Sequence, residues 1–449
     1  MRILIVGGDA AGMSAASQIR RRQPSWAVEV FEAGQRTSYA LCGTPYYLGG
    51  VVREIDQLVT LTPEQFARER GIPVHTGHLV TAVNPARKSI TVKDLATGQS
   101  RDEAYDRLLL ATGAEALMPT GLEPGPAGLF YLRSLDDAEN IRRAMGKAKS
   151  AVVVGAGYIG LEVAENMVEA GLEVTLLGRQ PAPIFEEELQ ALAAQALSRP
   201  GLTFRSMTDA VGLSPAPSGG LTVAVSQGEA VPAAVGVVGA GVRPRAELAA
   251  AAGLTLGVKQ AISVDRFQKT SDPFIYAAGD CAESYHRLSG AQTWVALALG
   301  ANRQGRVAGF NLCDEPEEFP GILGTSIMKI FGLALARTGL GLEEARRAGF
   351  PEAVKTVVKQ HSKPGYYPGS TPVTVIIIAD RATGRLLGGQ MGGTLEGVGQ
   401  RINTLAAALS TNMTVKEASG LDTAYAPPFA PVHDPVVIAC EVAAKNLKG

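Results

Sequence analysis

The sequence predicts an α/β protein with two doubly wound parallel sheets, followed by a smaller α+β domain. Two stretches of about thirty residues, beginning at residues 2 and 150, repeat the order strand, glycine turn, helix and strand, which is a βαβ unit. From about residue 325, apolar and polar residues alternate as in antiparallel strands. A chain of 449 residues is long enough for three units with separate cores.

Hydrophobic patterns predict the other elements in chain order. Between the two βαβ units, 105–113 (YDRLLLATG) reads as a buried strand that ends in a glycine turn, and 134–148 reads as a helix. Two further strands and a helix are expected after the second unit, at 235–249, 272–283 and 292–312. In the last part we expect strands within 325–339, 354–362 and 371–393, a helix over 396–415, and a short helix after a proline-rich tail.

Composition excludes several classes of protein. The net charge of −1 gives no field that would attract nucleic acid or an anionic membrane. No run of eighteen apolar residues occurs, so no membrane span is expected. The apolar start is too short for a signal peptide and reads as a strand. Four cysteines at irregular positions predict no disulfide framework, and we expect no metal site and a reducing, cytoplasmic location.

The second βαβ unit contains a complete G-x-G-x-x-G motif at Gly155, Gly157 and Gly160. The first glycine permits the turn, the second lets the backbone approach a pyrophosphate, and the third lets the helix pack on the strand. The motif therefore predicts a dinucleotide site, and the competing interpretation is a plain strand–helix turn. Gly178 and Arg179 follow the second strand where a ribose-binding carboxylate would stand. This favours NADPH, with NADH also accepted, unless Arg179 is an ordinary solvated charge.

The first βαβ unit has Gly7 and Gly12, with Asp9 where the middle glycine would be. Glu32 closes its second strand at the position that holds a ribose hydroxyl. The segments LLLATG and IYAAGD occur where an enzyme with two dinucleotides completes a flavin site. These features together predict that the first unit binds FAD.

With these motifs the chain resembles the FAD-dependent pyridine nucleotide–disulfide oxidoreductases along essentially its whole length. It is most similar to their single-cysteine branch, which contains coenzyme A disulfide reductase, NADH oxidase and NADH peroxidase. The resemblance implies a glutathione-reductase-like homodimer with Rossmann-like FAD and NAD(P) domains and a C-terminal α+β dimerisation domain. The implied boundaries are an FAD domain at 1–114 and 246–324, an NAD(P) domain at 115–245 and a dimerisation domain at 325–449.

The resemblance also implies the residues that bind the cofactors. For FAD these are Gly7, Ala11, Gly12, Glu32, Ala33, Val80, Ala111, Thr112, Gly113, Gly279 and Asp280. For NAD(P)H they are Gly155, Gly157, Tyr158, Ile159, Gly160, Gly178, Arg179 and Gly241. Asp280 would contact the ribityl chain of the flavin, and Tyr158 would gate the nicotinamide pocket.

Cys42 lies in the segment TSYALCGTPYYLGG. Two-cysteine members of the family have C-x-x-x-x-C, and the fifth position after Cys42 is Tyr47. Cys42 must therefore pair with a thiol from outside or become a sulfenic acid. As redox nucleophile it needs the thiolate, which a flavin or a helix N-terminus would stabilise. The competing interpretation is a small core residue, as we expect for Cys281, Cys313 and Cys440.

Two further segments favour the coenzyme A (CoA) disulfide reductases within the branch. The oxidases and peroxidases typically carry a histidine where this chain has Ala10, so the usual proton-handling group is missing. The reductases have tyrosines in YYPG and YAPPF segments, and both segments occur here. The resemblance implies that Tyr367 and Tyr425 reach Cys42 from the other subunit and protonate the departing CoA thiolate. Tyr366 competes with Tyr367 for this role.

CoA also needs cations for its phosphates. The positions that contact CoA in the resembling reductases are Ser14, Gln18, Arg21, Ser38, Arg70, Asn302 and His433. Ser14, Gln18 and Arg21 stand on successive turns of the first helix. Arg70 and His433 replace lysines, and a histidine is mostly neutral at pH 7. Some relatives have an asparagine that contacts CoA at position 41, where this chain has Leu41, so that contact is absent. For the arginines at 20–22, the interpretation that competes with CoA binding is an ordinary solvated face.

We therefore expect an enzyme that uses NAD(P)H, FAD and Cys42 to reduce CoA disulfide to CoA thiol. CoA persulfide or polysulfide would suit the same site, because the sulfur–sulfur bond and the CoA handle are alike. Two alternatives remain. One is an NADH oxidase that reduces oxygen through a Cys42 sulfenate, and the other is a non-catalytic flavoprotein that responds to redox state.

Overall fold

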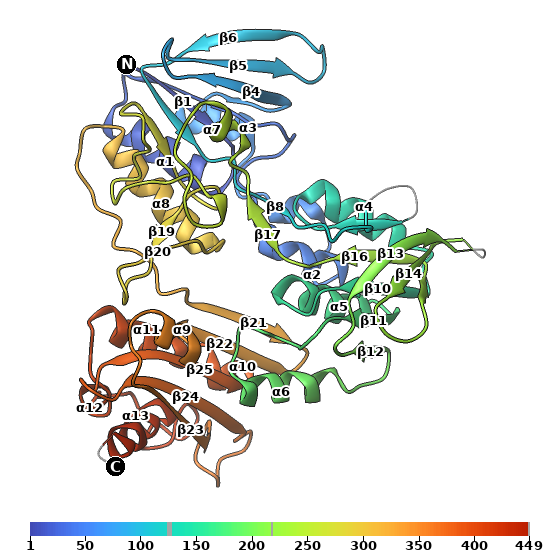
Figure 1. Ribbon diagram of the computed structural model, residues 1–449, viewed down its shortest axis with the longest axis vertical. Coiled ribbons are helices and arrows are strands. Elements are labelled where there is room, and N and C mark those ends of the chain that lie inside the picture. The colour runs from blue at the N-terminus through green and yellow to red at the C-terminus, as the bar shows by residue number, and fades with distance from the viewer. Residues whose placement is uncertain (124–127, 217–218, 448–449) are drawn as a thin grey trace.

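The computed structural model describes residues 1–123, 128–216 and 219–447. The last two residues of the chain and two short internal segments lie outside these ranges, within the second and third predicted domains. Three groups of elements are visible in Figure 1, one at the top, one at the right and one at the bottom. Each group is built around its own five-stranded sheet.

The first sheet is parallel and has the strand order β18-β7-β1-β2-β3. Its strands are β1 (Arg2–Val6), β2 (Ala27–Phe31), β3 (Val74–His75), β7 (Arg107–Leu110) and β18 (Ile275–Ala277). Helices α1 (Ala10–Arg22) and α8 (Ala298–Asn311) pack closely on each other. A Cβ added at Gly305 would lie 2.2 Å from the Ala11 carbonyl oxygen, so this contact requires glycine.

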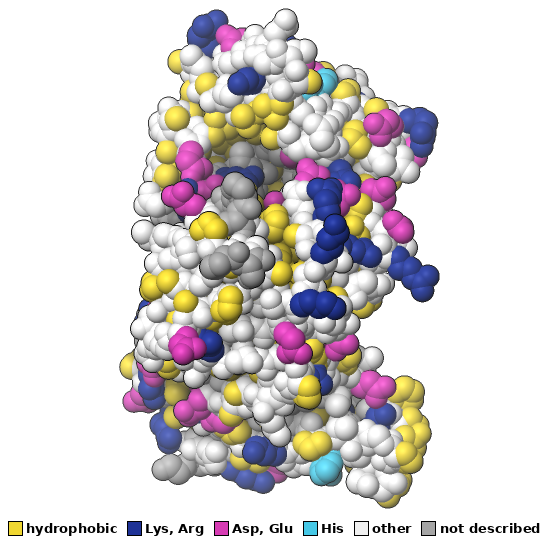
Figure 2. All heavy atoms as spheres, turned by 90° about the vertical axis from the view of Figure 1, so that its right-hand side faces the viewer, with side chains coloured by type: hydrophobic (Ala, Val, Ile, Leu, Met, Phe, Trp, Pro, Cys, Tyr) yellow, Lys and Arg dark blue, Asp and Glu magenta, His cyan; other side chains and the backbone are white. Residues whose placement is uncertain are grey.

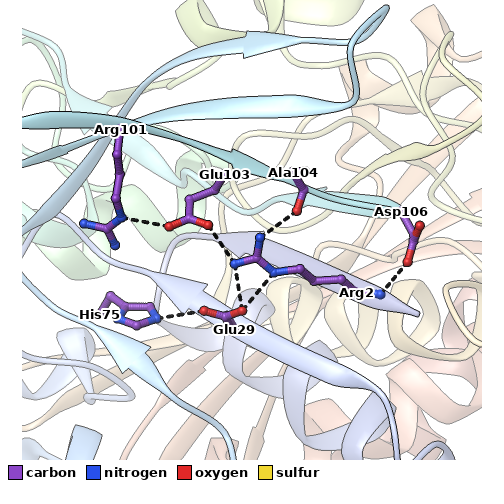
Figure 3. Close-up of polar contacts among 7 residues, drawn as sticks. All are labelled: Arg2, Glu29, His75, Arg101, Glu103, Ala104 and Asp106. Carbon is purple, nitrogen blue, oxygen red and sulfur yellow. Dashed lines mark hydrogen bonds and ion pairs between the residues drawn. The ribbon is translucent and has the colours of Figure 1, made fainter.

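An antiparallel sheet covers the edge of this group, as the top of Figure 1 shows. It consists of β4 (His78–Asn84), β5 (Ser89–Asp94) and β6 (Ser100–Ala104). Figure 3 shows how Arg2 in β1 joins it to the parallel sheet. The Arg2 guanidinium donates to Glu29 in β2 at 3.0 Å and to Glu103 in β6 at 2.8 Å. The same network contains His75, Arg101, Ala104 and Asp106.

The second sheet is also parallel, with the order β12-β11-β10-β16-β9. Its strands are β9 (Leu129–Tyr131), β10 (Ser150–Val154), β11 (Glu173–Leu177), β12 (Leu202–Arg205) and β16 (Val235–Val238). Helices α4 (Leu135–Met145), α5 (Tyr158–Glu169) and α6 (Glu187–Leu197) accompany it, with a small sheet of β13 (Ala210–Pro215), β14 (Leu221–Val225) and β15 (Val231–Ala233). The chain passes from the first group to the second through β8 (Ala114–Ala116) and returns through β17 (Val242–Pro244), and these two strands pair with each other.

The third sheet is antiparallel throughout, which confirms the sequence-based expectation. Its order is β21-β22-β25-β24-β23, with β21 (Ser326–Ile330), β22 (Leu333–Gly339), β23 (Ala353–His361), β24 (Pro372–Asp380) and β25 (Leu386–Gly393). The helices of this group are α9 (Leu342–Arg347), α10 (Leu395–Val398), α11 (Arg401–Ser410), α12 (Val415–Ala418) and α13 (Pro435–Asn446).

Two predicted helices differ from the observed ones. The helix expected over 396–415 is divided into α10, α11 and the start of α12, because Thr414 caps a new helix by accepting from the Glu417 N–H. The helix expected over 292–312 begins only at α8. Gln292–Thr293 instead form β20, which pairs with β19 (Ser284–Tyr285).

The short elements that remain position the loops. They are η1 (Leu41–Gly43), α2 (Thr44–Leu48), η2 (Ile55–Leu58), α3 (Pro63–Arg70), α7 (Glu247–Ala251) and η3 (Val258–Gln260). Among the described residues, no helix is both long and apolar enough to cross a bilayer. The face seen in Figure 2 carries both basic and acidic side chains.

One hydrophobic core extends from the second group into the third. It contains buried residues of α4, α5 and β10 together with residues of β21, β22 and β24. Helix α5 also contacts α2, which directly follows the Cys42 segment in the chain and lies beside the second group in Figure 1. Because α5 contacts α2, β10 and β21, it holds the segment after Cys42, the second sheet and the third sheet in fixed relation.

Candidate active site

The residues predicted to bind FAD converge at one edge of the first sheet. Gly7 follows β1, Glu32 follows β2, Ala111–Gly113 follow β7, and Gly279 and Asp280 follow β18. All four strands are parallel, so these turns lie at the common carboxyl edge. Val80 lies apart from them in β4, buried in the same core cluster as Val6 and Phe31.

The turn after β1 needs both of its predicted glycines. Gly7 has φ +109°, and a Cβ there would lie 2.1 Å from the Ala111 carbonyl oxygen. A Cβ at Gly12 would lie 1.9 Å from the Gly7 carbonyl oxygen. Asp9 begins α1, and its carboxylate accepts the Tyr39 N–H at 3.2 Å. Asp9 is therefore tied to the Cys42 loop, and burial raises its pKa to about 6.

The carboxylate of Glu32 is fixed by backbone donors at the end of β2. It accepts the N–H groups of Gly8 and Gly34, each at 2.7 Å. Ala33 stands between Glu32 and Gly34 in the chain. At Gly113, on the same edge, an added Cβ would meet nothing within 4 Å, so the turn after β7 leaves open space.

Asp280 closes the other end of this edge. Its Oδ2 lies 3.8 Å from Nη2 of Arg133, and burial raises its pKa while Arg133 opposes that shift. The Nε of Arg133 is buried and has no hydrogen-bond partner among the described residues. The glycine turns, the open edge, the fixed carboxylates and this unpaired donor fit an extended dinucleotide with polar groups such as FAD.

The second glycine motif has the geometry that its spacing predicts. Gly155 has φ +107°, and a Cβ at Gly160 would lie 1.7 Å from the Gly155 carbonyl oxygen. At Gly157 an added Cβ would meet nothing within 4 Å. The first and third glycines therefore serve the packing of the chain, and the second faces open space at the start of α5.

That open space is a cavity of about 930 Å³. Its wall includes the predicted nucleotide residues Gly155, Gly157, Tyr158, Ile159, Gly178, Arg179 and Gly241. Leu41, Cys42, Thr44 and Pro45 line it as well. The nucleotide motif and Cys42 therefore share one cavity. Tyr158 stands at the first position of α5, and its hydroxyl forms a hydrogen bond with Ser326 of β21.

Arg179 is exposed at the rim of this cavity and pairs with Asp209. The Nη2 of Arg179 and Oδ2 of Asp209 are 3.0 Å apart. This exposed pair is open to exchange with an incoming anion, because its charges are well solvated. Gly178, just before it, leaves no room for a side chain, since an added Cβ would lie 2.8 Å from the Cβ of Ala156.

Cys42 is the exposed cysteine of the chain, and the loop before it is anchored to the turn after β1. The Thr37 hydroxyl and the Ser38 N–H both donate to the Gly8 carbonyl oxygen. Burial raises the pKa of Cys42, and Glu162 raises it further. The protein groups around Cys42 therefore do not produce the expected lowering of its pKa. Cys281, Cys313 and Cys440 are buried, as predicted.

Sequence reasoning missed Glu162, which lines the same cavity as Cys42. It stands four residues after Tyr158 in α5, and that spacing places both side chains on one helical face. The four-residue spacing of Tyr158 and Glu162 can be recognised in the sequence, but nothing in the sequence shows that this helical face lines the same cavity as Cys42. Burial raises the pKa of Glu162 to about 7, and Lys329 opposes the shift.

A second cavity of about 440 Å³ gathers most of the residues predicted to contact CoA. These are Ser14, Arg21, Ser38, Arg70 and Asn302. Arg303 and Arg306 of α8 also line it, so four arginines surround this cavity. Arg306 stands four residues after Asn302, a spacing that the prediction overlooked. Gln18 is buried behind the wall, where its Oε1 accepts from Arg21 at 2.6 Å.

Tyr367, Tyr425 and His433 line neither of these cavities within the described part of one chain. They lie in the third group, where Tyr425 is 48% exposed. Tyr366 is the tyrosine beside Tyr425. Desolvation and a hydrogen bond to Tyr425 raise the pKa of Tyr366.

The buried guanidinium of Arg401 fastens the segments that carry these tyrosines. Its Nε donates to Asp434 at 2.6 Å, next to His433, and its Nη2 donates to the Ser362 carbonyl at 3.0 Å, near Tyr366. The buried Arg401 side chain therefore fixes both the segment that follows Ser362 and the segment that precedes Asp434.

Two nucleotide-type sheets, with an accessible thiol facing the cavity of one of them, define a nucleotide-dependent thiol–disulfide oxidoreductase. The chain belongs to the pyridine nucleotide-disulphide oxidoreductase family, whose model matches residues 1–305. The dimerisation domain of that family matches residues 325–435 and supports a homodimer. The protein is thus an FAD-dependent oxidoreductase that uses a pyridine nucleotide.

Known proteins resemble the chain along its full length. The "NAD(P)H sulfur oxidoreductase (CoA-dependent)" of Pyrococcus furiosus is 35% identical over 447 residues, covering 98% of each chain. The "Coenzyme A disulfide reductase" of Staphylococcus epidermidis is 31% identical over 438 residues, covering 96% of this chain and 97% of that protein. A solved NAD-dependent persulfide reductase from A. fulgidus superposes with a TM-score of 0.95 at 34% identity, over 100% of this chain and 84% of that one.

Proposed function

We propose that the protein reduces the sulfur–sulfur bond of CoA disulfide, or of CoA persulfide or polysulfide, with NAD(P)H. One observation carries this proposal. The exposed thiol of Cys42 lines the nucleotide cavity, and Ser38 of the same loop lines the cavity with four arginines. A substrate that combines a disulfide with several phosphates suits this pairing, and relatives named for CoA chemistry support it.

The chemistry follows from the placement of Cys42. FAD, when bound, supplies the transfer of an electron pair from NAD(P)H to sulfur. As a thiolate, Cys42 attacks the substrate disulfide, one CoA thiolate leaves and takes up a proton, and a mixed disulfide with Cys42 forms. An electron pair and a second proton then release the second thiol and restore the Cys42 thiolate.

We assign the cofactor roles as the glycine turns suggest. The turns after β1, β2, β7 and β18 would hold FAD, with Asp280 near its ribityl chain. The turns after β10, β11 and β16 would hold the nicotinamide nucleotide, with Tyr158 as the gate of its pocket. Arg179 would exchange Asp209 for a 2′-phosphate, which favours NADPH while NADH is also accepted.

We assign Arg21 and Arg70 to the phosphates of CoA. In this proposal Tyr425, His433 and either Tyr366 or Tyr367 come from the second subunit, and a tyrosine protonates the departing thiolate. The exposure of Tyr366, Tyr425 and His433 in one chain supports a role at a subunit boundary, and Tyr367 is half-buried. Tyr425→Phe should slow turnover with unchanged flavin content, and an unchanged rate would refute this role. Parallel Tyr366→Phe and Tyr367→Phe variants decide which neighbour takes part.

Two assignments concern the whole chain. We propose a cytoplasmic location, because all four cysteines are unpaired, as a reducing compartment requires. We also propose domain boundaries after residues 114, 245 and 324. The first two fall at the paired crossing strands β8 and β17, and the third falls just before β21.

The NADH oxidase alternative is less well supported, because Ala10 provides no imidazole for oxygen chemistry. We would follow NADPH and NADH consumption anaerobically with CoA disulfide, and aerobically without it. The proposal expects anaerobic consumption that depends on CoA disulfide. Rapid consumption only in the presence of oxygen would instead identify an oxidase, and a faster reaction with CoA persulfide would identify that species as the substrate.

Cys42→Ser separates an enzyme from a redox-responsive binding protein. The variant should lose disulfide-dependent NAD(P)H consumption and keep FAD. Cys313, two residues beyond the end of α8, lines neither cavity, so Cys313→Ala should keep both properties and serves as the matched control. If Cys42→Ser retains disulfide reduction, Cys42 is not the nucleophile. If biological function survives in Cys42→Ser, the protein acts as a redox-responsive binding protein and its function does not depend on catalytic turnover.

A further inference from the structure

The segment of residues 178–186 joins β11 to α6 and forms one side of the nucleotide cavity. Every residue from 178 to 185 except Pro181 lines this cavity. The segment includes Arg179, which is proposed to meet a 2′-phosphate. It also includes Phe185, whose ring meets that of Tyr158 edge to face, with the ring centroids 6.3 Å apart. The position of the segment therefore determines where several groups of the cavity wall stand.

The local structure of the segment does not fix its path. Although the structure describes every residue from 178 to 186, none of them belongs to a helix or a strand. Ala182 has φ +50°, a left-handed conformation that alanine rarely adopts. A residue keeps such a conformation only where its surroundings hold it. The path of the segment therefore depends on contacts with other parts of the chain.

The third sheet supplies two of these contacts from neighbouring strands. Arg337 in β22 and Gln390 in β25 stand directly opposite each other in the register, and both are buried. The Nη1 of Arg337 donates to the Ile184 carbonyl oxygen at 2.6 Å. The Oε1 of Gln390 accepts the Glu186 N–H at 2.8 Å. One cross-strand pair in the middle of the third sheet thus holds the end of the segment.

Helix α9 completes this attachment. The Oε1 of Glu186 accepts the Leu342 N–H at 2.9 Å. The carboxylate of Glu344 pairs with the Arg337 guanidinium and accepts the Gly341 N–H at 2.8 Å. Hydrogen bonds that involve a charged group are the strong and directional ones. The Arg337 side chain is therefore itself held in one orientation, and it can serve as a fixed support.

Neither Arg337 nor Gln390 is among the described residues that line the nucleotide cavity. Both can therefore affect a bound nucleotide only through the segment that they hold. We propose that Arg337 and Gln390 are positioning residues that keep residues 178–186 in the conformation that binds NAD(P)H. Both belong to the dimerisation domain, so this domain prepares the nucleotide site of the second sheet. The inference rests on the proposed placement of the nucleotide in this cavity.

The expected effect follows from the population of the binding conformation. A nucleotide that meets a segment already in place does not have to order it, and this makes binding tighter. Once the segment is released, the apparent Kd rises in inverse proportion to the fraction of molecules that keep the observed conformation. If that fraction falls to about one fifth, the Kd rises about fivefold.

The test measures binding of NADP⁺ to the holoenzyme by calorimetry. NADP⁺ cannot reduce a flavin, so binding is measured without turnover. Arg337→Met should raise the Kd about fivefold or more, and Gln390→Leu should change it in the same direction. Arg337→Lys should fall between Arg337→Met and the wild type, because its ammonium group can still donate to the Ile184 carbonyl. FAD content should stay normal in all three variants.

Lys355 in β23 offers a matched control between the same two groups of elements. Its Nζ lies 2.9 Å from Glu188 and 3.3 Å from Glu187, both in α6, and 3.6 Å from Glu186. Glu187 and Glu188 are not among the described residues that line the cavity. Lys355→Met should therefore lower the unfolding temperature and leave the Kd for NADP⁺ unchanged.

Two results would overturn the proposal. One is an unchanged Kd in both Arg337→Met and Gln390→Leu, and the other is an equal rise in Lys355→Met, which would indicate a general effect of domain contact. If Arg337→Met does not fold, Arg337→Lys and Gln390→Leu decide the question by the same comparison.

Gly157→Ala, measured in the same titration, separates this inference from the placement on which it rests. If Gly157→Ala leaves the Kd for NADP⁺ unchanged, the nucleotide binds elsewhere, and the placement and the positioning role both fail. If Gly157→Ala weakens binding and the Arg337 and Gln390 variants do not, only the positioning role fails. The titration contains no CoA compound, so a failure to reduce CoA disulfide does not affect its result.

Discussion

Gly157 and Gly160 stand in the same motif, and the structure predicts opposite effects of changing each to alanine. At Gly160 the new Cβ would lie 1.7 Å from the Gly155 carbonyl oxygen, which is backbone that cannot turn aside. At Gly157 the new Cβ meets nothing within 4 Å, and φ −85° and ψ −168° suit any residue. One substitution should therefore damage the fold, and the other should damage nucleotide binding.

The expected magnitudes differ accordingly. Gly160→Ala forces the start of α5 away from β10 and should cost about 1–3 kcal/mol or more, which exceeds the ~1 kcal/mol gained from helix propensity. Gly157→Ala should change stability by no more than about 0.5 kcal/mol. Its methyl group would enter the space of the pyrophosphate and should weaken NADPH binding about tenfold or more, because the backbone donors lose their approach.

Thermal unfolding of the holoproteins gives the first quantity, and titration of NADPH against protein fluorescence gives the second. FAD content should stay normal in Gly157→Ala, because the turns proposed to hold FAD belong to the other parallel sheet. Unchanged NADPH affinity in Gly157→Ala would show that the backbone at this position does not face the nucleotide. An unchanged unfolding temperature in Gly160→Ala would show that α5 does not pack on β10 as described.

Three further predictions concern charges. Arg401→Met leaves the carboxylate of Asp434 buried without its partner and should cost about 3–5 kcal/mol, seen as a lower unfolding temperature. The raised pKa of Glu162 stabilises the fold below pH 4.5, and this contribution is lost as pH rises to about 7. The free energy of unfolding of Glu162→Gln should thus exceed that of the wild type by up to ~3 kcal/mol at pH 8 but not at pH 4.5, seen as a higher unfolding temperature at pH 8 only. Equal differences at the two pH values would contradict this. Arg179→Ala should raise the Kd for NADPH several-fold and leave that for NADH unchanged, whereas equal losses would indicate a general charge effect.

Much of the fold could be predicted because its signals are local. A buried strand followed by glycines and a helix is recognisable within thirty residues, and the structure has this order in both βαβ units. The alternation of apolar and polar residues after residue 325 likewise predicted the antiparallel strands. The start of α8 was not, because residues 292–293 join β19 through a pairing that hydrophobic periodicity does not encode.

The sequence by itself determined where the chain makes its glycine turns after the parallel strands, since turn geometry depends on glycines that are neighbours in sequence. Only the tertiary structure decided what surrounds Cys42. Glu162 is more than a hundred positions away, and packing of α5 against α2 brings it to the same cavity. The arginines of the second cavity likewise come from α1, α3 and α8, which meet only when the first sheet is complete. Burial and charge at a site are properties of such long-range contacts, so the pKa values of Glu162 and Cys42 could not be read from the sequence.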